Sequence, residues 1–427
     1  MFVLKFKAGA LQLTTFIIVV IALLLTTFIL LIHLHKQFQI QSDFIIDTTN
    51  LANSGVDYVI QNNVKINDTI AIDLNEEDYK NLKIYRKFWG VFEQVISTAA
   101  IKNRRFQKVA FLGAKQQKSN RAVLYVQDNN TPLVLVGMTK IEGLAYLPKQ
   151  GVKSGYISGQ SYYGSRLIYG GTRVSSKLPK LSSDVVNSIS QLEQSYSKLP
   201  LNQFFNIQES TTFTNSFLQP LQIVFSNDEI NLRNIQIIGH VLLQSKSKIV
   251  VHSSSNLKDV ILMAPEIELR SNTKGSFQAI ASKKIVVGDN VKLNYPSALV
   301  VKEKNGSQKE TSTSVSRDEV SKVVVEKDAV IKGVIMFIGE DRPNNYQSQI
   351  LIKESATVYG ELYNTQNTEL QGAVYGSIFT SNFIANQSGA VYKNHIYNGK
   401  INVNELPREY VGLLFNDSKK GIMKWLY

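Results

Sequence analysis

Few side chains in this sequence could act together as acid and base. The carboxylates within its most regular β-type repeats are Asp259, Asp289 and Asp328. Two carboxylates that cleave a glycosidic bond must flank the same bond, but no two of these are separated by the repeat interval of 18 residues. Each also lies at a strand-to-turn position, where aspartate is common for conformational reasons. We therefore predict no catalytic residue.

Metal and cofactor chemistry has equally little support. The histidines are His33, His35, His240, His252 and His395, and none has the spacing of a metal ligand relative to another histidine or a carboxylate. The absence of cysteine excludes disulfides, thiolate metal sites and cysteine nucleophiles. Two glycine-containing stretches, which begin at Gly288 and at Gly170, are not followed by the helix that a phosphate-binding loop requires. We expect neither a metal nor a cofactor.

One aromatic group could bind sugar by stacking. Tyr156, Tyr162 and Tyr163 lie close to Arg166 in a glycine-rich segment. Tyrosine is also common in the core of β proteins, and that interpretation of these residues remains open.

The net charge of +13 indicates an anionic partner. The densest basic stretch contains a candidate anionic-ligand surface formed by Lys83, Arg86, Lys87, Arg104 and Arg105. Beside a membrane, such a surface would bind phosphate-bearing lipid or acidic polysaccharide rather than nucleic acid. The alternative is a solvated face that keeps a large β protein soluble.

The strongest pattern is an apolar run that continues as an amphipathic helix. Ala8–Ile32 is uncharged and mostly aliphatic, and about 20 such residues suffice to cross a bilayer. After Lys36, apolar residues recur at helical spacing opposite a polar stripe. The apolar positions are Phe38, Phe44, Ile45, Leu51, Ala52, Val56 and Val59. We expect one helix of about 52 residues, roughly 78 Å long, whose distal half packs on the folded body.

The run is longer than the apolar core of a cleaved signal peptide, which remains the alternative to an uncleaved anchor. Lys5 and Lys7 precede the span, so the positive-inside rule predicts a cytoplasmic amino terminus. The body would then lie in the periplasm or at the cell exterior, beyond the inner membrane of a bacterium.

Repeats dominate the second half of the chain. Ile249, Ile267 and Ile285 begin three-residue β strings at intervals of 18, with Leu262, Ile280 and Ala298 in the same register upstream. A gapless match at an offset of 27 aligns Val323–Ile335 with Ile350–Leu362, and a shorter echo follows. Gly333, Gly360 and Gly376 would occupy corners with positive φ, and Gly339–Gln347 would be an inserted loop. This period favours a parallel β-solenoid.

These patterns predict a mainly β protein with one long amino-terminal helix, an α/β neck and a right-handed parallel β-helix. The expected segments are residues 1–36, a cytoplasmic stub and transmembrane helix; 37–82, the exposed continuation of the helix with a polar connection and a turn or helix start at 75–78; 83–225, a β-rich neck with a helix near 182–197; 226–405, the solenoid with a mobile loop at 302–318; and 406–427, a cap on the last coil.

Two resemblances arise from these residues. Residues 5–62 resemble the amino-terminal helix of type IV pilin-like minor subunits, including minor pseudopilins, through Lys7-Ala8-Gly9 before Ala10-Leu11-Gln12 and the unbroken apolar half. The resemblance implies cleavage between Gly9 and Ala10 and helix packing against other pilin-like subunits. Thr14 stands where that family usually has glutamate. The valine-rich coils from Ile230 to Ile401 resemble bactofilin-like, polymer-forming β-solenoids.

We therefore expect a non-enzymatic envelope protein, a pilin-like minor subunit or assembly component of a secretion or pilus-type machine. One alternative is a membrane-anchored scaffold or adhesin that binds anionic cell-envelope polysaccharide. A second alternative is a membrane-tethered β-helix enzyme acting on polysaccharide.

Overall fold

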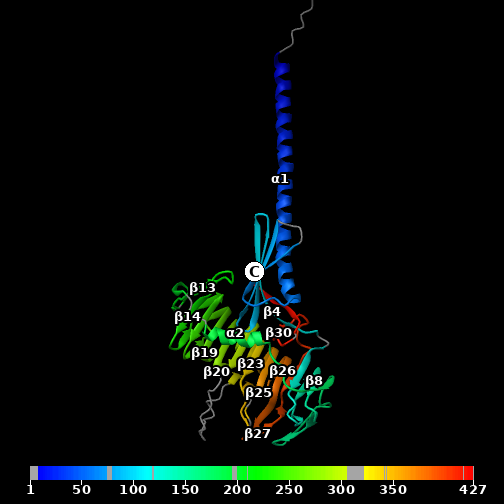
Figure 1. The fold of residues 1–427 in the computed structure, drawn as a ribbon, viewed down its shortest axis with the longest axis vertical. Helices are drawn as coiled ribbons and strands as arrows, with labels where there is room; N and C mark the ends of the chain where they lie inside the picture. The colour runs from blue at the N-terminus through cyan, green and yellow to red at the C-terminus, as the bar shows by residue number, and fades with distance from the viewer. Residues whose placement is uncertain are drawn as a thin grey trace, which may run out of the picture. The chain divides into compact units, whose positions relative to one another are not determined.

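The computed structural model describes residues 8–74, 79–117, 120–194, 200–208, 210–304, 322–340, 342, 344–416 and 418–426 (Figure 1). The chain divides into two units, Met1–Tyr85 with Ile96–Lys108, and Arg86–Val95 with Val109–Tyr427. Three strands contribute residues to both units: β2 (Lys80–Trp89), β3 (Phe92–Ile101) and β4 (Arg104–Lys115).

The first unit contains the long helix α1, Ala8–Gln61. Its 54 residues confirm the expected single helix, since proline is absent and the serine and threonine hydroxyls bond back to their own helix, as Thr48 does to the Phe44 carbonyl. The strand β1 (Asp68–Ile72) follows, and it was not predicted. The turn or helix start expected at 75–78 lies outside the described residues. The neighbouring strands β3 and β4 are joined at Lys102, whose φ is 51°.

The second unit contains the remaining strands and two short helices. They are β5 (Ala122–Val126), β6 (Leu133–Val136), β7 (Lys140–Glu142), β8 (Leu144–Leu147), β9 (Val152–Ser154), β10 (Tyr156–Ile157), β11 (Gln160–Ser161), β12 (Thr172–Val174), α2 (Ser183–Gln194), η3 (Leu201–Gln203), β13 (Thr212–Asn215), β14 (Gln222–Ser226), β15 (Ile230–Leu232), β16 (Gln236–Gly239), β17 (Val241–Ser245), β18 (Lys248–Val251), β19 (Asn256–Leu269), β20 (Lys274–Val287), β21 (Lys292–Lys302), β22 (Lys322–Val325), β23 (Val330–Ile338), β24 (Ile350–Ile352), β25 (Thr357–Leu370), β26 (Ala373–Gln387), β27 (Ala390–Lys393), β28 (His395–Tyr397), β29 (Lys400–Asn402), β30 (Val411–Gly412) and β31 (Lys420–Trp425).

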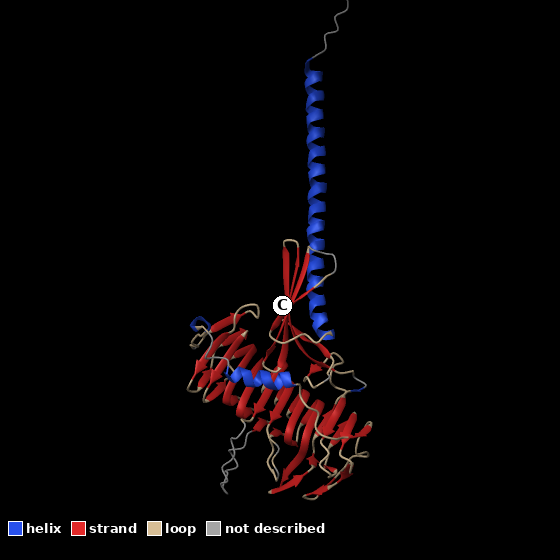
Figure 2. Cartoon of the chain, viewed as in Figure 1, coloured by secondary structure: helices blue, strands red, loops and turns tan. Residues whose placement is uncertain are grey.

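Most of these strands form a solenoid-like stack of parallel coils, here called the coil stack (Figure 2). The 18-residue repeat is confirmed, because Ile249 pairs with Ile267, which pairs with Ile285. The upstream register was wrong: Leu262 pairs with Ala279 rather than Ile280, because the register shifts between Lys258 and Ile261. A second shift pairs Ile280 with Val300 rather than with Ala298.

The 27-residue offset is also confirmed, and its glycines form a ladder. Gly333 pairs with Gly360, which pairs with Gly376, and all three have positive φ, between 144° and 156°. A Cβ at Gly360 or Gly376 would lie 1.8 Å from the carbonyl oxygen of the preceding glycine. Only glycine permits this approach of the stacked backbones. The loop predicted after β23 is present, whereas residues 305–318 of the expected mobile loop lie outside the described residues.

The coil stack extends beyond the segment expected for it. β5 and β8, from the expected neck, pair with each other, and β5 also pairs with β26. At the other end, β13 and β14 pair with β16 and β17. The carboxy-terminal strand β31 does not cap the last coil but pairs antiparallel with β4. The predicted helix is present as α2, with Val185 and Ile189 buried and 195–197 outside the described residues.

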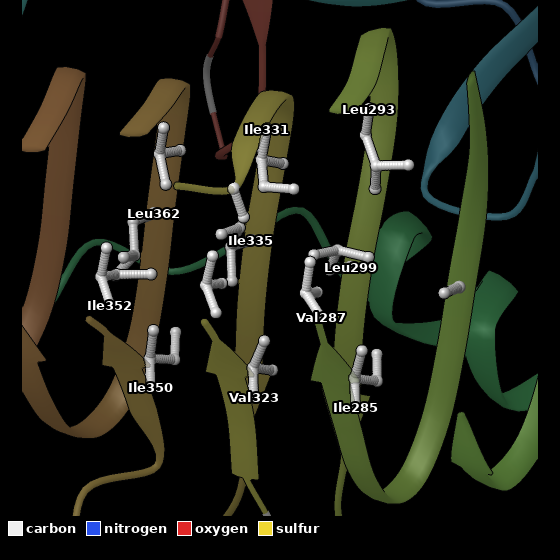
Figure 3. Packing of buried hydrophobic residues seen from close by; sticks show 14 of the residues in the cluster. Ile285, Val287, Leu293, Leu299, Val323, Ile331, Ile335, Ile350, Ile352 and Leu362 are labelled. Carbon is white, nitrogen blue, oxygen red and sulfur yellow. The ribbon is translucent and has the colours of Figure 1, made fainter. Parts of the chain in front are cut away.

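Aliphatic columns fill the coil stack (Figure 3). Ile285, Val323 and Ile350 occupy successive coils in one column and are fully buried. Each buried side chain of this size contributes about 1.5–3 kcal/mol. The regular column fixes where the corners, and thus the polar side chains on them, recur.

Candidate functional site

The amino-terminal part of α1 is a continuous exposed apolar surface. The large apolar side chains between Leu11 and Ile32 are between 39% and 75% exposed. The helix is long and apolar enough to cross a membrane. Removing this surface from water is favourable by about 25 cal/mol per Å². Lipid or another apolar partner is therefore expected to cover it.

The carboxy-terminal part of α1 packs on strands of the same unit. Ala52, Val56 and Val59 are buried, as predicted, and Ala52 belongs to an apolar cluster with Leu82 and Ala99. The prediction was wrong for Phe38 and Ile45, which are 71% and 51% exposed.

Gly55 allows the closest approach in this packing. A Cβ there would lie 2.2 Å from Oγ of Ser97. The buried face therefore depends on a small residue as well as on the apolar stripe.

The predicted processing site lies at the exposed start of α1. Gly9 and Ala10 are both helical and exposed, and beyond the neighbouring residues and backbone of its own helix no atom lies within 4 Å of a Cβ built at Gly9. The Thr14 hydroxyl donates to the carbonyl of Ala10 or Leu11, at 3.1 and 2.9 Å. Threonine thus satisfies its polar group within the helix, which an ionised glutamate could not do in lipid without a partner. Cleavage itself remains a prediction.

The predicted basic surface is not one surface. Lys83, Arg104 and Arg105 are exposed, but Arg86 is only 4% exposed. Its Nε and Nη2 donate to both carboxylate oxygens of Glu93, at 2.7 and 3.0 Å. The alternation of a strand turns Arg86 away from the face that Lys83 occupies, and Arg86 was therefore wrongly assigned to a ligand surface.

Lys87 was also wrongly assigned to that surface. Burial lowers the pKa of its ammonium group to about 8, and Nζ lies 3.3 Å from Nε2 of His240. Burial, followed by the charge of Lys87, lowers the pKa of His240 to about 3, so the imidazole is neutral. The His240 ring packs against Trp89 and Phe217 at 4.8 and 5.2 Å. This cluster is part of the packing.

Two of the three candidate carboxylates occupy structural positions, and Asp289 is exposed. Asp259 and Asp328 have φ of 62° and 57°, as expected for turn residues. Asp259 pairs with Lys424 at 2.5 Å. Among the described residues, no group of three or more histidine, aspartate or glutamate side chains could hold a metal ion. In the part of the chain that the structure describes, the most perturbed carboxyl group is that of Glu361, which was not predicted.

Glu361 is buried beneath the carboxy-terminal segment. Burial raises the pKa of its carboxyl group to about 7, against the opposing hydrogen bond from the Leu413 backbone. That N–H donates to Oε2 at 2.6 Å. Tyr410 and Arg121 lie nearby, and burial also raises the pKa of the Tyr410 phenol. Its burial and its backbone hydrogen bond account for Glu361 as a structural group.

Two members of the predicted aromatic group are exposed and the third is packed. Tyr156 and Tyr163 are 66% and 60% exposed. The Tyr162 hydroxyl instead donates to the Arg166 carbonyl, and its ring packs against the core. Two of the three tyrosines are therefore available to a ligand.

A polar cavity that the sequence did not reveal lies on the coil stack. It measures about 260 Å³ and is lined by asparagine, glutamine, serine and threonine side chains together with Arg342 and Lys393. We call it the amide groove. Its sequence signal is a set of asparagines at the same corner of successive coils, and finding it requires the correct register of every coil.

The structure defines a mainly β protein with one long, apolar amino-terminal helix and a parallel, solenoid-like stack. The chain matches no protein-family model, and neither a curated protein nor a solved structure is significantly similar to it.

Proposed function

We propose that this chain is a non-enzymatic, single-pass membrane protein that acts as a pilin-like subunit or assembly component and carries the coil stack outside the membrane. The observation that supports this function is the division of α1. One continuous helix has an apolar half exposed on all sides and a second half with a single buried face. A helix whose only role was to anchor would not need this continuity into a packed sheet.

The proposal includes the topology. Lys5 and Lys7 favour a cytoplasmic amino terminus, and the body then lies in the periplasm or at the cell exterior of a bacterium. The coils are inferred to wind right-handed, because about 98% of parallel crossover connections do so.

The apolar half of α1 would leave lipid to pack against the same helix of neighbouring subunits. This exchange buries the same surface in either environment, so small differences in packing can drive assembly.

The decisive measurement is the intact mass of the amino-terminal peptide of protein isolated from native membranes. A chain that begins at Ala10 supports processing at Gly9 and the pilin-like role. A chain that begins at Met1 contradicts processing and favours the static scaffold. Replacement of Gly9 by leucine should block processing, whereas the control substitution Ala22→Leu in the same helix should not.

Helix association can be tested separately because the chain has no cysteine. A single cysteine at Leu24, which is 61% exposed, should form intermolecular disulfides in membranes if the helices pack together. A cysteine at Val56, on the buried face, should not. Equal cross-linking at both positions would contradict the proposed use of the helix.

A scaffold or adhesin that binds anionic polysaccharide is the second candidate. The exposure of Lys83, Arg104 and Arg105 favours it. Reversing the charge of Arg104 and Arg105 should release the protein from an acidic polysaccharide matrix under this function alone.

A further inference from the structure

The amide groove is built from one corner of four successive coils. Phe337 pairs with Asn364, Asn364 with Thr380, and Thr380 with Val126. Residues that follow these four paired positions along the chain line the cavity: Asn345, Gln366 and Asn367, Ser381 and Asn382, and Asn129. In β25 they lie at a register shift within the strand. The groove is thus part of a rigid repeating scaffold.

Hydrogen bonds fix the polar side chains of the groove. Nδ2 of the buried Asn367 donates to the carbonyls of Asn345 and Gln347 at 3.1 and 3.0 Å. Nδ2 of Asn129 donates to the Ser381 carbonyl at 3.0 Å and to Oδ1 of Asn382 at 2.7 Å. Groups held in this way lose little entropy when a ligand binds.

The floor retains polar capacity towards the cavity. Ser381 and Asn367 are 5% and 4% exposed. Oδ1 of Asn367 accepts no hydrogen bond from any described residue, although its Nδ2 makes two. This oxygen is not among the fully buried atoms, so water or a ligand in the cavity can supply its donor.

The charge of the groove is positive. Among the described lining residues there are two cations and no carboxylate. Arg342 is neutralised by Glu303, with Nη2 and Oε2 2.6 Å apart. Nζ of Lys393 instead lies 4.1 Å from the ring centroid of Tyr346, which is 51% exposed. Lys393 is therefore the cation available to an acidic ligand.

We propose that the amide groove is a binding site for a saccharide with a carboxylate group. Sugar hydroxyls both donate and accept, and amides and hydroxyls offer both functions at fixed positions. The volume of about 260 Å³ is at the small end of ligand pockets, which suits a single sugar ring. The ammonium group of Lys393 would bind the carboxylate by a charge-assisted hydrogen bond.

The proposal is independent of processing at Gly9, because it concerns only the coil stack. It also differs from the basic face of Lys83, Arg104 and Arg105, none of which lines the groove. Asparagine ladders can stabilise stacked strands without any ligand, so the experiment must separate binding from packing.

The test uses the full chain in detergent and ligand-observed saturation-transfer NMR. The probes are two matched pairs, galacturonate with galactose and glucuronate with glucose. We expect at least one acid to bind more tightly than its neutral partner, by about tenfold. Lys393→Gln should remove this difference, while the control Lys292→Gln, at an exposed position outside the groove, should not.

A blocking variant separates the site from the rest of the surface. Thr131→Trp places a large ring at the exposed rim and should abolish binding, whereas Thr172→Trp on the exposed strand β12 should leave it unchanged. Absence of binding to all four probes would overturn the proposal, as would equal binding to Thr131→Trp and Thr172→Trp. Equal affinity for an acid and its neutral partner would overturn the role of Lys393.

Discussion

Adding one methyl group at Gly360 should destabilise the coil stack far more than its size suggests. The alanine Cβ would lie 1.8 Å from the Gly333 carbonyl oxygen, in a backbone with φ of 147°. The coils cannot separate locally, because Gly333 and Gly376 hold the neighbouring coils in the same ladder. An unfavourable backbone conformation costs about 1–3 kcal/mol, and overpacking costs about 1–3 kcal/mol more. We expect Gly360→Ala to lose about 2–6 kcal/mol in the free energy of unfolding.

The assay is urea unfolding of the full chain in a fixed detergent, followed by far-ultraviolet circular dichroism. Gly389→Ala is the matched control, because Gly389 also has positive φ, 81°, but no atom beyond its chain neighbours lies within 4 Å of its Cβ. The control isolates the backbone contribution, about 1–2 kcal/mol. If Gly360→Ala is no more destabilising than Gly389→Ala, the ladder is not close-packed and the reasoning fails.

Three further substitutions test buried groups. Glu361→Gln should remove a decline in stability between about pH 4.5 and 7, because the folded carboxyl group, with a pKa of about 7, keeps a proton that the unfolded one has released. Over this pH range the wild-type free energy of unfolding should fall by about 3 kcal/mol more than that of the variant. The measurement is urea unfolding at a series of pH values. Arg86→Met should cost about 3 kcal/mol by the same unfolding assay, because Glu93 is fully buried and loses its bidentate partner. The cost is at the low end for a broken buried pair because Lys420 keeps its ion pair with Oε1 of Glu93 at 3.0 Å. Gly55→Leu should separate the end of α1 from Ser97 and accelerate amide hydrogen exchange over residues 51–59.

Each has its own contradicting outcome, and the last two have a control substitution. A pH slope that persists in Glu361→Gln would assign it to another group. Arg104→Met, at an exposed position, should change stability by no more than about 0.5 kcal/mol, and an equal loss in both arginine variants would contradict the buried pair. Ser54→Leu, on the exposed side of α1, should leave hydrogen exchange unchanged, and protection that survives Gly55→Leu would show that the helix end tolerates the clash.

The outcome for the basic stretch shows where sequence reasoning failed. Lys83, Arg86 and Lys87 are equally basic in the sequence, yet only Lys83 is exposed. Arg86 is buried because it pairs with Glu93 across the sheet. Lys87 is partly buried because it packs against His240, a residue 153 positions away in the chain that local sequence patterns cannot reveal. Charge by itself does not indicate which face of a strand meets another element.

The sequence by itself determined α1, the repeat intervals and the glycine ladder. Each depends on a local period, 3.6 residues for a helix or one coil for the stack, and a period can be read along the chain. Tertiary structure alone decided the pairing of β31 with β4, the burial of Glu361 and the assembly of the amide groove. These depend on partners far apart in sequence, such as Asn129 and Ser381, which meet only because the register of every intervening coil is fixed.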